Sequence, residues 1–147
     1  MKRPVVLIVE DNPDDQTLMQ LAIAEARASF EAVFVPDGQD ALDWLFRQGA
    51  HADRDEGVFP ALVLLDLKLT RLSGLDVLRA LRGDPLGRLI AVVVLTTSEM
   101  PSDIEKAYEL GANAYVQKPM GFPALVDLVE AIHAFWLSYN VVHPALR

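Results

Sequence analysis

Acidic, hydroxyl and basic side chains stand at the ends of four apolar runs of the sequence, where together they could do chemistry. Glu10 and Asp11 follow one run and Asp66 follows another. Carboxylates brought close together repel one another unless a cation lies among them, and Mg²⁺ with oxygen ligands is the natural partner. Thr96 and Lys118 end two further runs and carry donors that suit an oxyanion. The set predicts phosphoryl chemistry at one of the carboxylates.

Each of these residues also has a purely structural interpretation. An acid after a buried strand is often a helix cap, a threonine at a strand end often bonds the backbone, and a single lysine is most often solvated. Asp66 differs because it closes the apolar run 62–65 and is followed by Leu67. An acid within an apolar run needs a partner or a function. The joint occurrence at four strand ends therefore favours a site.

Two alternating apolar patterns predict the elements that must position these side chains. Short continuous runs rich in Val, Ile and Leu are typical of strands buried on both faces, as in a parallel sheet. They lie at 4–9, 32–35, 61–65, 90–95 and 114–116. Helical spacing is found at 14–28, 40–48, 75–81, 102–110 and 121–139. The order predicts an α/β fold, a (βα)₅ doubly wound parallel five-stranded sheet of the flavodoxin-like type, which binds ligands at the carboxyl ends of its strands.

The local sequence also predicts where these helices begin and which side they bury. Asn12 followed by Pro13 fits an N-cap and a first helical position. In the helix over 14–28, the spacing predicts a core-facing stripe of Leu18, Leu21, Ala22 and Ala26. The polar segment 50–60 is interpreted as a surface loop.

Composition excludes several classes of protein. The 147 residues contain no cysteine, so disulfide scaffolds and thiolate metal sites are excluded. The formal net charge of −8 argues against sequence-independent binding to DNA or to anionic lipid. No apolar run approaches the roughly 18 residues of a membrane span. We expect a cytoplasmic protein with one domain over 1–147, a core over about 4–139 and a C-terminal tail over 140–147.

The strand-end residues, taken together, resemble the receiver domain of bacterial two-component response regulators. Thr96 lies 30 residues after Asp66, Lys118 lies a further 22 along, and Gly74 follows Asp66 by eight, as in that family. The resemblance runs from about residue 5 to residue 139. The phrases at 95–98, 109–115 and 135–137 are most similar to receivers that partner phytochrome-type histidine kinases.

The resemblance implies a phosphoacceptor rather than an enzyme with an external substrate. Asp66 would accept a phosphoryl group from a phosphohistidine of a sensor histidine kinase and would later lose it by Mg²⁺-dependent self-dephosphorylation. Mg²⁺ would be held by Asp11, Asp66 and the backbone carbonyl of Lys68, with Glu10 reached through water. Lys118 would pair with a phosphoryl oxygen.

The resemblance also implies a conformational switch. Thr96 would donate a hydrogen bond to the phosphoryl group and move towards it, and the ring of Tyr115 would rotate into the space. Without the family layout, Tyr115 would be interpreted as a half-buried strand aromatic with its hydroxyl in water. The family further implies a cis peptide between Lys118 and Pro119. Lys68 and Thr70 depart from the family's usual residues, which bears on the stiffness of their loop.

The last helix and the tail are more apolar than one buried face requires. We expect a homodimer through the fourth helix, the fifth strand and the fifth helix, together with the tail. The candidate interface residues are Phe122, Val126, Phe135, Leu137 and Tyr139. In the alternative, the tail folds back and covers them within one chain.

Three other functions share parts of this pattern. A haloacid-dehalogenase-type phosphatase also uses an aspartate at a strand end, but the segment 66–70 lacks its second acid. A flavodoxin-like cofactor binder needs a phosphate loop after the first strand, where Glu10 and Asp11 would repel a phosphate. A degenerate receiver that serves only as a docking scaffold stays open. A DNA-binding regulator is disfavoured because no segment remains for a helix-turn-helix.

Overall fold

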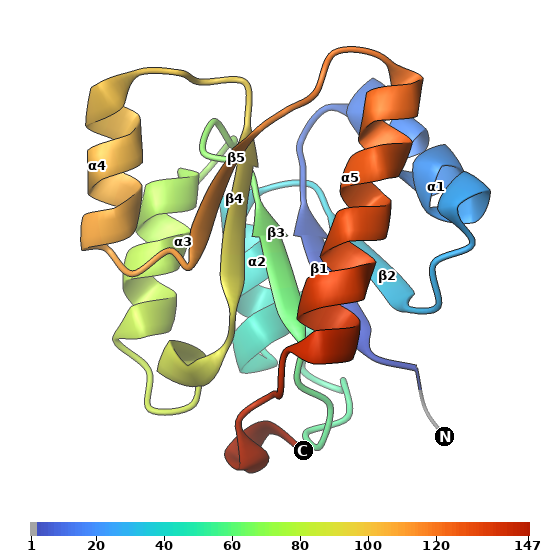
Figure 1. Ribbon diagram of the computed structural model, residues 1–147. Coiled ribbons are helices and arrows are strands. Elements are labelled where there is room, and N and C mark those ends of the chain that lie inside the picture. Colours follow the sequence, from blue (N-terminus) through green and yellow to red (C-terminus); the bar gives the residue numbers. More distant parts are fainter. Residues whose placement is uncertain (1–2) are drawn as a thin grey trace.

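A five-stranded parallel sheet lies between two layers of helices in the computed structural model, which describes residues 3–147 (Figure 1). The first two residues of the predicted domain lie outside the described residues. The strands are β1 (Val5–Val9), β2 (Glu31–Val35), β3 (Leu62–Leu65), β4 (Val92–Thr96) and β5 (Ala114–Gln117). The α-helices are α1 (Pro13–Ala26), α2 (Gly38–Phe46), α3 (Gly74–Arg82), α4 (Pro101–Glu109) and α5 (Phe122–Ala134). The predicted (βα)₅ fold is confirmed, with the strand order β2-β1-β3-β4-β5.

The three central strands are buried along their whole length. Every residue of β1, β3 and β4 is buried, whereas the edge strands β2 and β5 are partly exposed. Continuous burial explains why these strands read as unbroken runs of Val, Ile and Leu. Because all neighbours pair in parallel, the carboxyl ends of all five strands lie at one edge of the sheet.

The helices cover the two faces of the sheet unequally. α1 and α5 lie on one face, and α2, α3 and α4 lie on the other (Figure 1). The predicted core stripe of α1 is wrong in part, since Leu18 and Leu21 are 43% and 54% exposed while Met19 and Ala22 are buried. The set 19, 22, 23 and 26 also has helical spacing, and packing against α5 selects it over the predicted set.

The chain after α5 turns back under the sheet. A π-helical turn (Phe135–Tyr139) continues the helix, and a 3₁₀ turn (Pro144–Leu146) follows. Leu146 is buried and Val142 packs against the core on the α2–α4 side. The tail therefore covers part of the amino edge of the sheet. The remaining 3₁₀ turns are Gly49–His51 and Gly87–Leu89.

Arg54 helps to hold the polar segment 50–60 against the core. Arg54 donates hydrogen bonds to the carbonyls of Trp44 and Val58, at 2.8 and 2.5 Å, and its guanidinium stacks 4.0 Å from the centre of the Trp44 ring. The predicted loop is thus a fixed part of the surface. None of the described helices is both long enough and apolar enough to cross a membrane.

Candidate functional site

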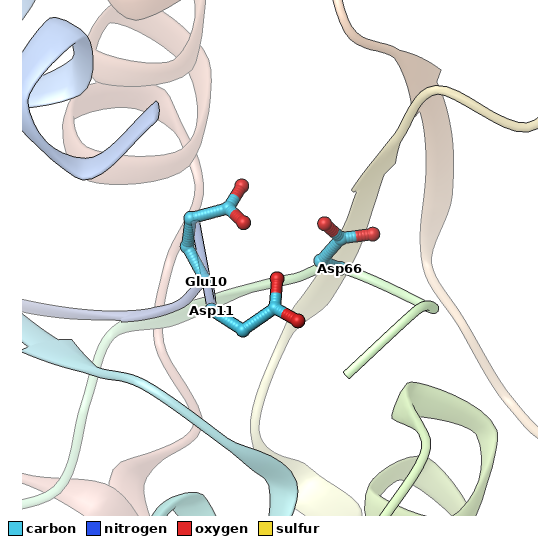
Figure 2. A group of neighbouring side chains, drawn as sticks. All are labelled: Glu10, Asp11 and Asp66. Carbon is cyan, nitrogen blue, oxygen red and sulfur yellow. The ribbon is translucent and has the colours of Figure 1, made fainter. Parts of the chain in front are cut away.

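The register of two neighbouring strands brings three carboxylates together. Val9 of β1 lies opposite Leu65 of β3, so that the residues after them, Glu10 and Asp66, meet at the carboxyl edge. The amide of Asp66 donates to the carbonyl of Val9 at 3.2 Å, which fixes this alignment. Glu10, Asp11 and Asp66 each offer a carboxylate oxygen within 4.8 Å of the others (Figure 2). The predicted convergence of these acids is found.

Because these carboxylates are buried, holding them close together in their charged forms is unfavourable. Glu10 and Asp66 are only 6% and 7% exposed. Burial raises the pKa of the Glu10 carboxyl, and the hydrogen bonds from Lys118 and from the amide of Asn12 offset only part of that rise. The nearby charge of Asp66 adds to it. A further cation at this place would relieve the repulsion between the acids.

Lys118 is the basic centre of the cluster. Its Nζ donates to Asp66 at 3.0 Å, to Asp15 at 3.0 Å and to Glu10. Its own amide donates to the carbonyl of Thr96 at 2.7 Å, which anchors it beyond the end of β5. Burial lowers the pKa of Lys118, but its hydrogen bonds to Glu10 and Asp66 and the charge of Asp66 raise it more, so the ammonium stays protonated.

Asp15 is a member of this cluster that sequence reasoning missed. It lies in the first turn of α1 and not at a strand end, so the strand-end pattern could not reveal it. The signal was the cap at Asn12, whose Oδ1 accepts from the amides of Asp14 and Asp15 at 2.9 and 3.1 Å. That cap places the second acid of the turn beside the strand ends.

Thr96 and Tyr115 are connected through a second missed residue, Ser98. Thr96 is fully buried, and its hydroxyl accepts from the amide of Ser98 at 3.4 Å. The Tyr115 hydroxyl donates to the carbonyl of Ser98 at 3.0 Å. Tyr115 is half-buried in β5, as its structural interpretation expects, but its hydroxyl also has a protein acceptor that this interpretation did not include. Burial raises the pKa of this phenol.

The loop after Asp66 packs closely against the helix that follows. A side chain on Gly74 would place its Cβ 2.1 Å from the carbonyl oxygen of Asp66, so only glycine fits there. The amide of Gly74 donates to the carbonyl of Leu67 at 2.9 Å. Lys68 directs its amide to Asp66 Oδ1 at 3.3 Å, and its side chain is exposed.

The predicted cis peptide between Lys118 and Pro119 is wrong for this structure. Every peptide bond among the described residues is trans. The trans isomer is the more stable one for most X–Pro bonds, by roughly 0.5–1 kcal/mol. With the bond trans, the long side chain of Lys118 still reaches all three of its carboxylate partners.

A cavity of about 250 Å³ opens beside the carboxylates. It runs between α1 and the segment that joins β5 to α5, and it reaches Glu10, Asp15, Asp66 and Lys118. Its other walls are mostly apolar and include Leu18, Met19, Met120, Phe122 and Leu125. The site is thus accessible along a path with apolar walls.

The five candidate interface residues divide into two groups. Val126 and Leu137 pack partly against the core between the sheet and α5. Phe122, Phe135 and Tyr139 are 36%, 52% and 80% exposed. The tail covers none of these three to the point of burial, so apolar side chains stay exposed at the start of α5 and in the π-helical turn.

Comparisons with known proteins agree with this geometry. The family model of the response regulator receiver domain matches residues 6–130 of this chain. Response regulator Rcp1 of Synechocystis is 36% identical over 141 residues, 96% of this chain and 93% of Rcp1. The structure of the phosphorylated cyanobacterial phytochrome response regulator RcpA superposes with a TM-score of 0.87 at 36% identity, covering 97% of this chain and 99% of that one. The Mn²⁺-bound form of Rcp1 gives a TM-score of 0.84 at 34% identity, covering 95% and 99%.

Proposed function

The chain belongs to the response regulator receiver domain family, and on this basis we propose that it is a cytoplasmic signalling protein that accepts a phosphoryl group on Asp66 from a sensor histidine kinase. One observation carries the proposal. Asp66 is a buried carboxylate with an ammonium at 3.0 Å and two further acids close by, and it borders an open cavity. That is the arrangement a charged nucleophile needs to meet a polyanion.

The transfer exchanges one phosphorus bond for another. A carboxylate oxygen of Asp66 attacks phosphorus, the bond from phosphorus to the histidine nitrogen of the kinase breaks, and that nitrogen takes up a proton. Lys118 balances the charge on a phosphoryl oxygen, and the buried hydroxyl of Thr96 donates to another. Hydrolysis, which in this proposal depends on Mg²⁺, returns Asp66 to the free carboxylate and releases inorganic phosphate.

The donor set of the cluster fits a hard divalent cation. Three carboxylates with oxygens within 4.8 Å of one another, and no soft ligand among them, are what Mg²⁺ prefers. Asp11 and Asp66 would hold the ion with the backbone carbonyl of Lys68, and Glu10 would reach it through water. When bound, the ion supplies positive charge that neutralises the phosphoryl oxygens.

The output of phosphorylation would pass through Thr96 and Tyr115. Both are hydrogen-bonded to the Ser98 segment, so a shift of the Thr96 hydroxyl towards a phosphoryl group changes the partners of the Ser98 amide. The face made by α4, β5 and α5 would then repack as a two-state equilibrium. The link through Ser98 supports this route.

The partner kinase is proposed to be of the phytochrome type. The similarity to a phytochrome response regulator over 97% of the chain supports this. In this proposal the kinase delivers its histidine through the cavity beside Asp66. Leu18 and Met120, 43% and 94% exposed, are among the residues that line this cavity. These apolar side chains suit a protein partner.

A homodimer through α4, β5, α5 and the tail also belongs to the proposal. Phe135 and Tyr139 support it, because they are large, exposed and both part of the π-helical turn. Sedimentation velocity at micromolar concentration tests it: a wild-type dimer that Phe135→Ser converts to monomer is expected, and a monomeric wild type would contradict it.

The phosphoacceptor itself is tested by Asp66→Asn. With acetyl phosphate and Mg²⁺, the wild type is expected to gain one phosphoryl group by mass spectrometry, and the variant none. Asp14→Asn, an exposed acid of α1, is the matched control and should be phosphorylated normally. Phosphate on Asp66→Asn would contradict the proposal. No uptake by the folded wild type would favour the docking scaffold, and turnover of a phosphate monoester would favour the phosphatase.

A further inference from the structure

Asp15 differs from the other carboxylates around Lys118. Its Oδ2 lies 3.0 Å from the ammonium nitrogen, the same distance as Oδ2 of Asp66. Its side chain is 39% exposed, against 8% for Glu10 and 9% for Asp66. It also stands outside the group of three acids whose oxygens lie within 4.8 Å of one another. Asp15 therefore contacts the lysine without belonging to the candidate metal site.

The first turn of α1 holds Asp15 in this place. The side chain of Asn12 accepts from the Asp15 amide at 3.1 Å, and Gln16 Nε2 donates to the carbonyl of Glu10 at 2.6 Å. Pro13 fixes the backbone where the helix begins. The turn is thus tied to the residues that it faces, and the contact with Lys118 is built into the fold.

The ammonium of Lys118 has no donor left for a phosphoryl oxygen. It carries three N–H groups, and three carboxylates accept from it. Binding a phosphoryl oxygen requires that one of these contacts be given up. The contact with Asp15 is the most exposed, so water replaces it at the lowest cost.

We infer that Asp15 is a positioning residue that holds Lys118 in the unphosphorylated protein and releases it to the phosphoryl group. The inference rests on the proposed function of Asp66 as the acceptor. It means that Asp15 and the phosphoryl oxygen compete for one cation. A contact made only in the unphosphorylated state opposes phosphorylation, and the negative charge of Asp15 repels the incoming donor as well.

The test compares rates of phosphorylation by acetyl phosphate in Mg²⁺. Asp15→Asn keeps the shape of the side chain but removes its charge, and it is expected to raise the rate constant about two- to fivefold, the range of a partly exposed ion pair. Asp14→Asn changes the net charge equally in the same helical turn but contacts no lysine, so it should leave the rate unchanged. Asp15→Glu restores the carboxylate and should restore the wild-type rate.

A second measurement does not depend on phosphorylation. In protein labelled with ¹⁵N at lysine, the Nζ resonance of Lys118, assigned by Lys118→Arg, should move in Asp15→Asn and stay in place in Asp14→Asn. The inference is overturned if the two asparagine variants behave alike in both measurements, or if the resonance moves but phosphorylation is unchanged or slower. Absence of phosphorylation in the wild type, with the Lys118 resonance responding to Asp15→Asn, would instead overturn the proposed function and with it the competition.

Discussion

The two edges of the sheet are each organised around one half-buried basic side chain, but they treat its charge differently. At the carboxyl edge, Lys118 is surrounded by the carboxylates of Glu10, Asp15 and Asp66. At the amino edge, Arg82 of α3 meets only neutral acceptors. Its guanidinium donates to the carbonyls of Gly111, Gly87 and Ile90, at 2.9, 3.1 and 2.8 Å, and to the side-chain oxygen of Asn113 at 3.1 Å.

The difference fits two roles: the proposed phosphoryl chemistry at the carboxyl edge, and structural support at the amino edge. Arg82 joins the end of α3 to the segments before β4 and β5, and its bonds use four of the five N–H groups of the guanidinium. Lys118 is one cation among three carboxylates, so it cannot neutralise all of them. The pKa of Glu10 is raised, chiefly by burial and to a smaller extent by the charge of Asp66. A surplus of like charge costs stability and is retained where a ligand will relieve it.

The largest effect is expected at the carboxyl edge, where removing the charge of Lys118 should slow phosphorylation. Lys118→Met keeps the aliphatic length but removes the cation that would face the phosphoryl group. Phosphorylation by acetyl phosphate should fall about 100-fold or more, as when one charge-stabilising donor is lost from an active site. The rate is measured by mass spectrometry, and circular dichroism verifies that the variant is folded. A folded Lys118→Met that reacts at the wild-type rate would contradict the role of the lysine.

The matched change at the amino edge should affect stability instead. Arg82→Met leaves three carbonyls and an amide oxygen without their donor, and we expect the free energy of unfolding to fall by about 3 kcal/mol. Urea unfolding measures this loss, and the rate of phosphorylation below the melting transition should stay unchanged. If Arg82→Met slowed phosphorylation while folded, the two edges would be coupled and the contrast between them would fail.

The same contrast explains which parts of the fold and of the site could be predicted from the sequence. The strand ends were predictable because short apolar runs mark buried parallel strands, and parallel pairing must bring Glu10, Asp11 and Asp66 to one edge. Asp15 and Ser98 were not, since their roles depend on how a helical turn and a loop are placed against those ends. The core face of α1 was missed for a related reason. Apolar residues occupy two faces of that helix, and only packing against α5 decides between Leu18 and Met19.

The smallest effect is expected at Asp76, which lies in the first turn of α3 at the same edge as the cluster. Unlike the acids of the cluster, it shares its hydrogen-bond donors with no other carboxylate among the described residues. It forms a capping box with Ser73, whose hydroxyl donates to the Asp76 carboxylate at 2.9 Å and accepts from its amide at 3.1 Å. The hydrogen bonds from Ser73 hold the pKa of Asp76 below its ordinary value, the opposite direction to Glu10. A raised pKa at this edge therefore goes with the burial of Glu10 and is not shared by Asp76.

A carboxyl whose pKa is lower in the folded protein stabilises the fold above its unfolded pKa, and that stability is lost as the pH falls through the folded pKa. Asp76→Asn should therefore be less stable than the wild type at pH 7, by less than the roughly 1 kcal/mol typical of losing a cap. The gap should close as the pH falls below about 4. Urea unfolding from pH 7 to pH 3 measures the gap, with Asp14→Asn as a control that loses an uncontacted acid from a first helical turn. If the difference in stability stayed constant over this range, the asparagine side chain would be destabilising through its geometry and not through its missing charge. The contrast between Asp76 and Glu10 would then have no electrostatic basis.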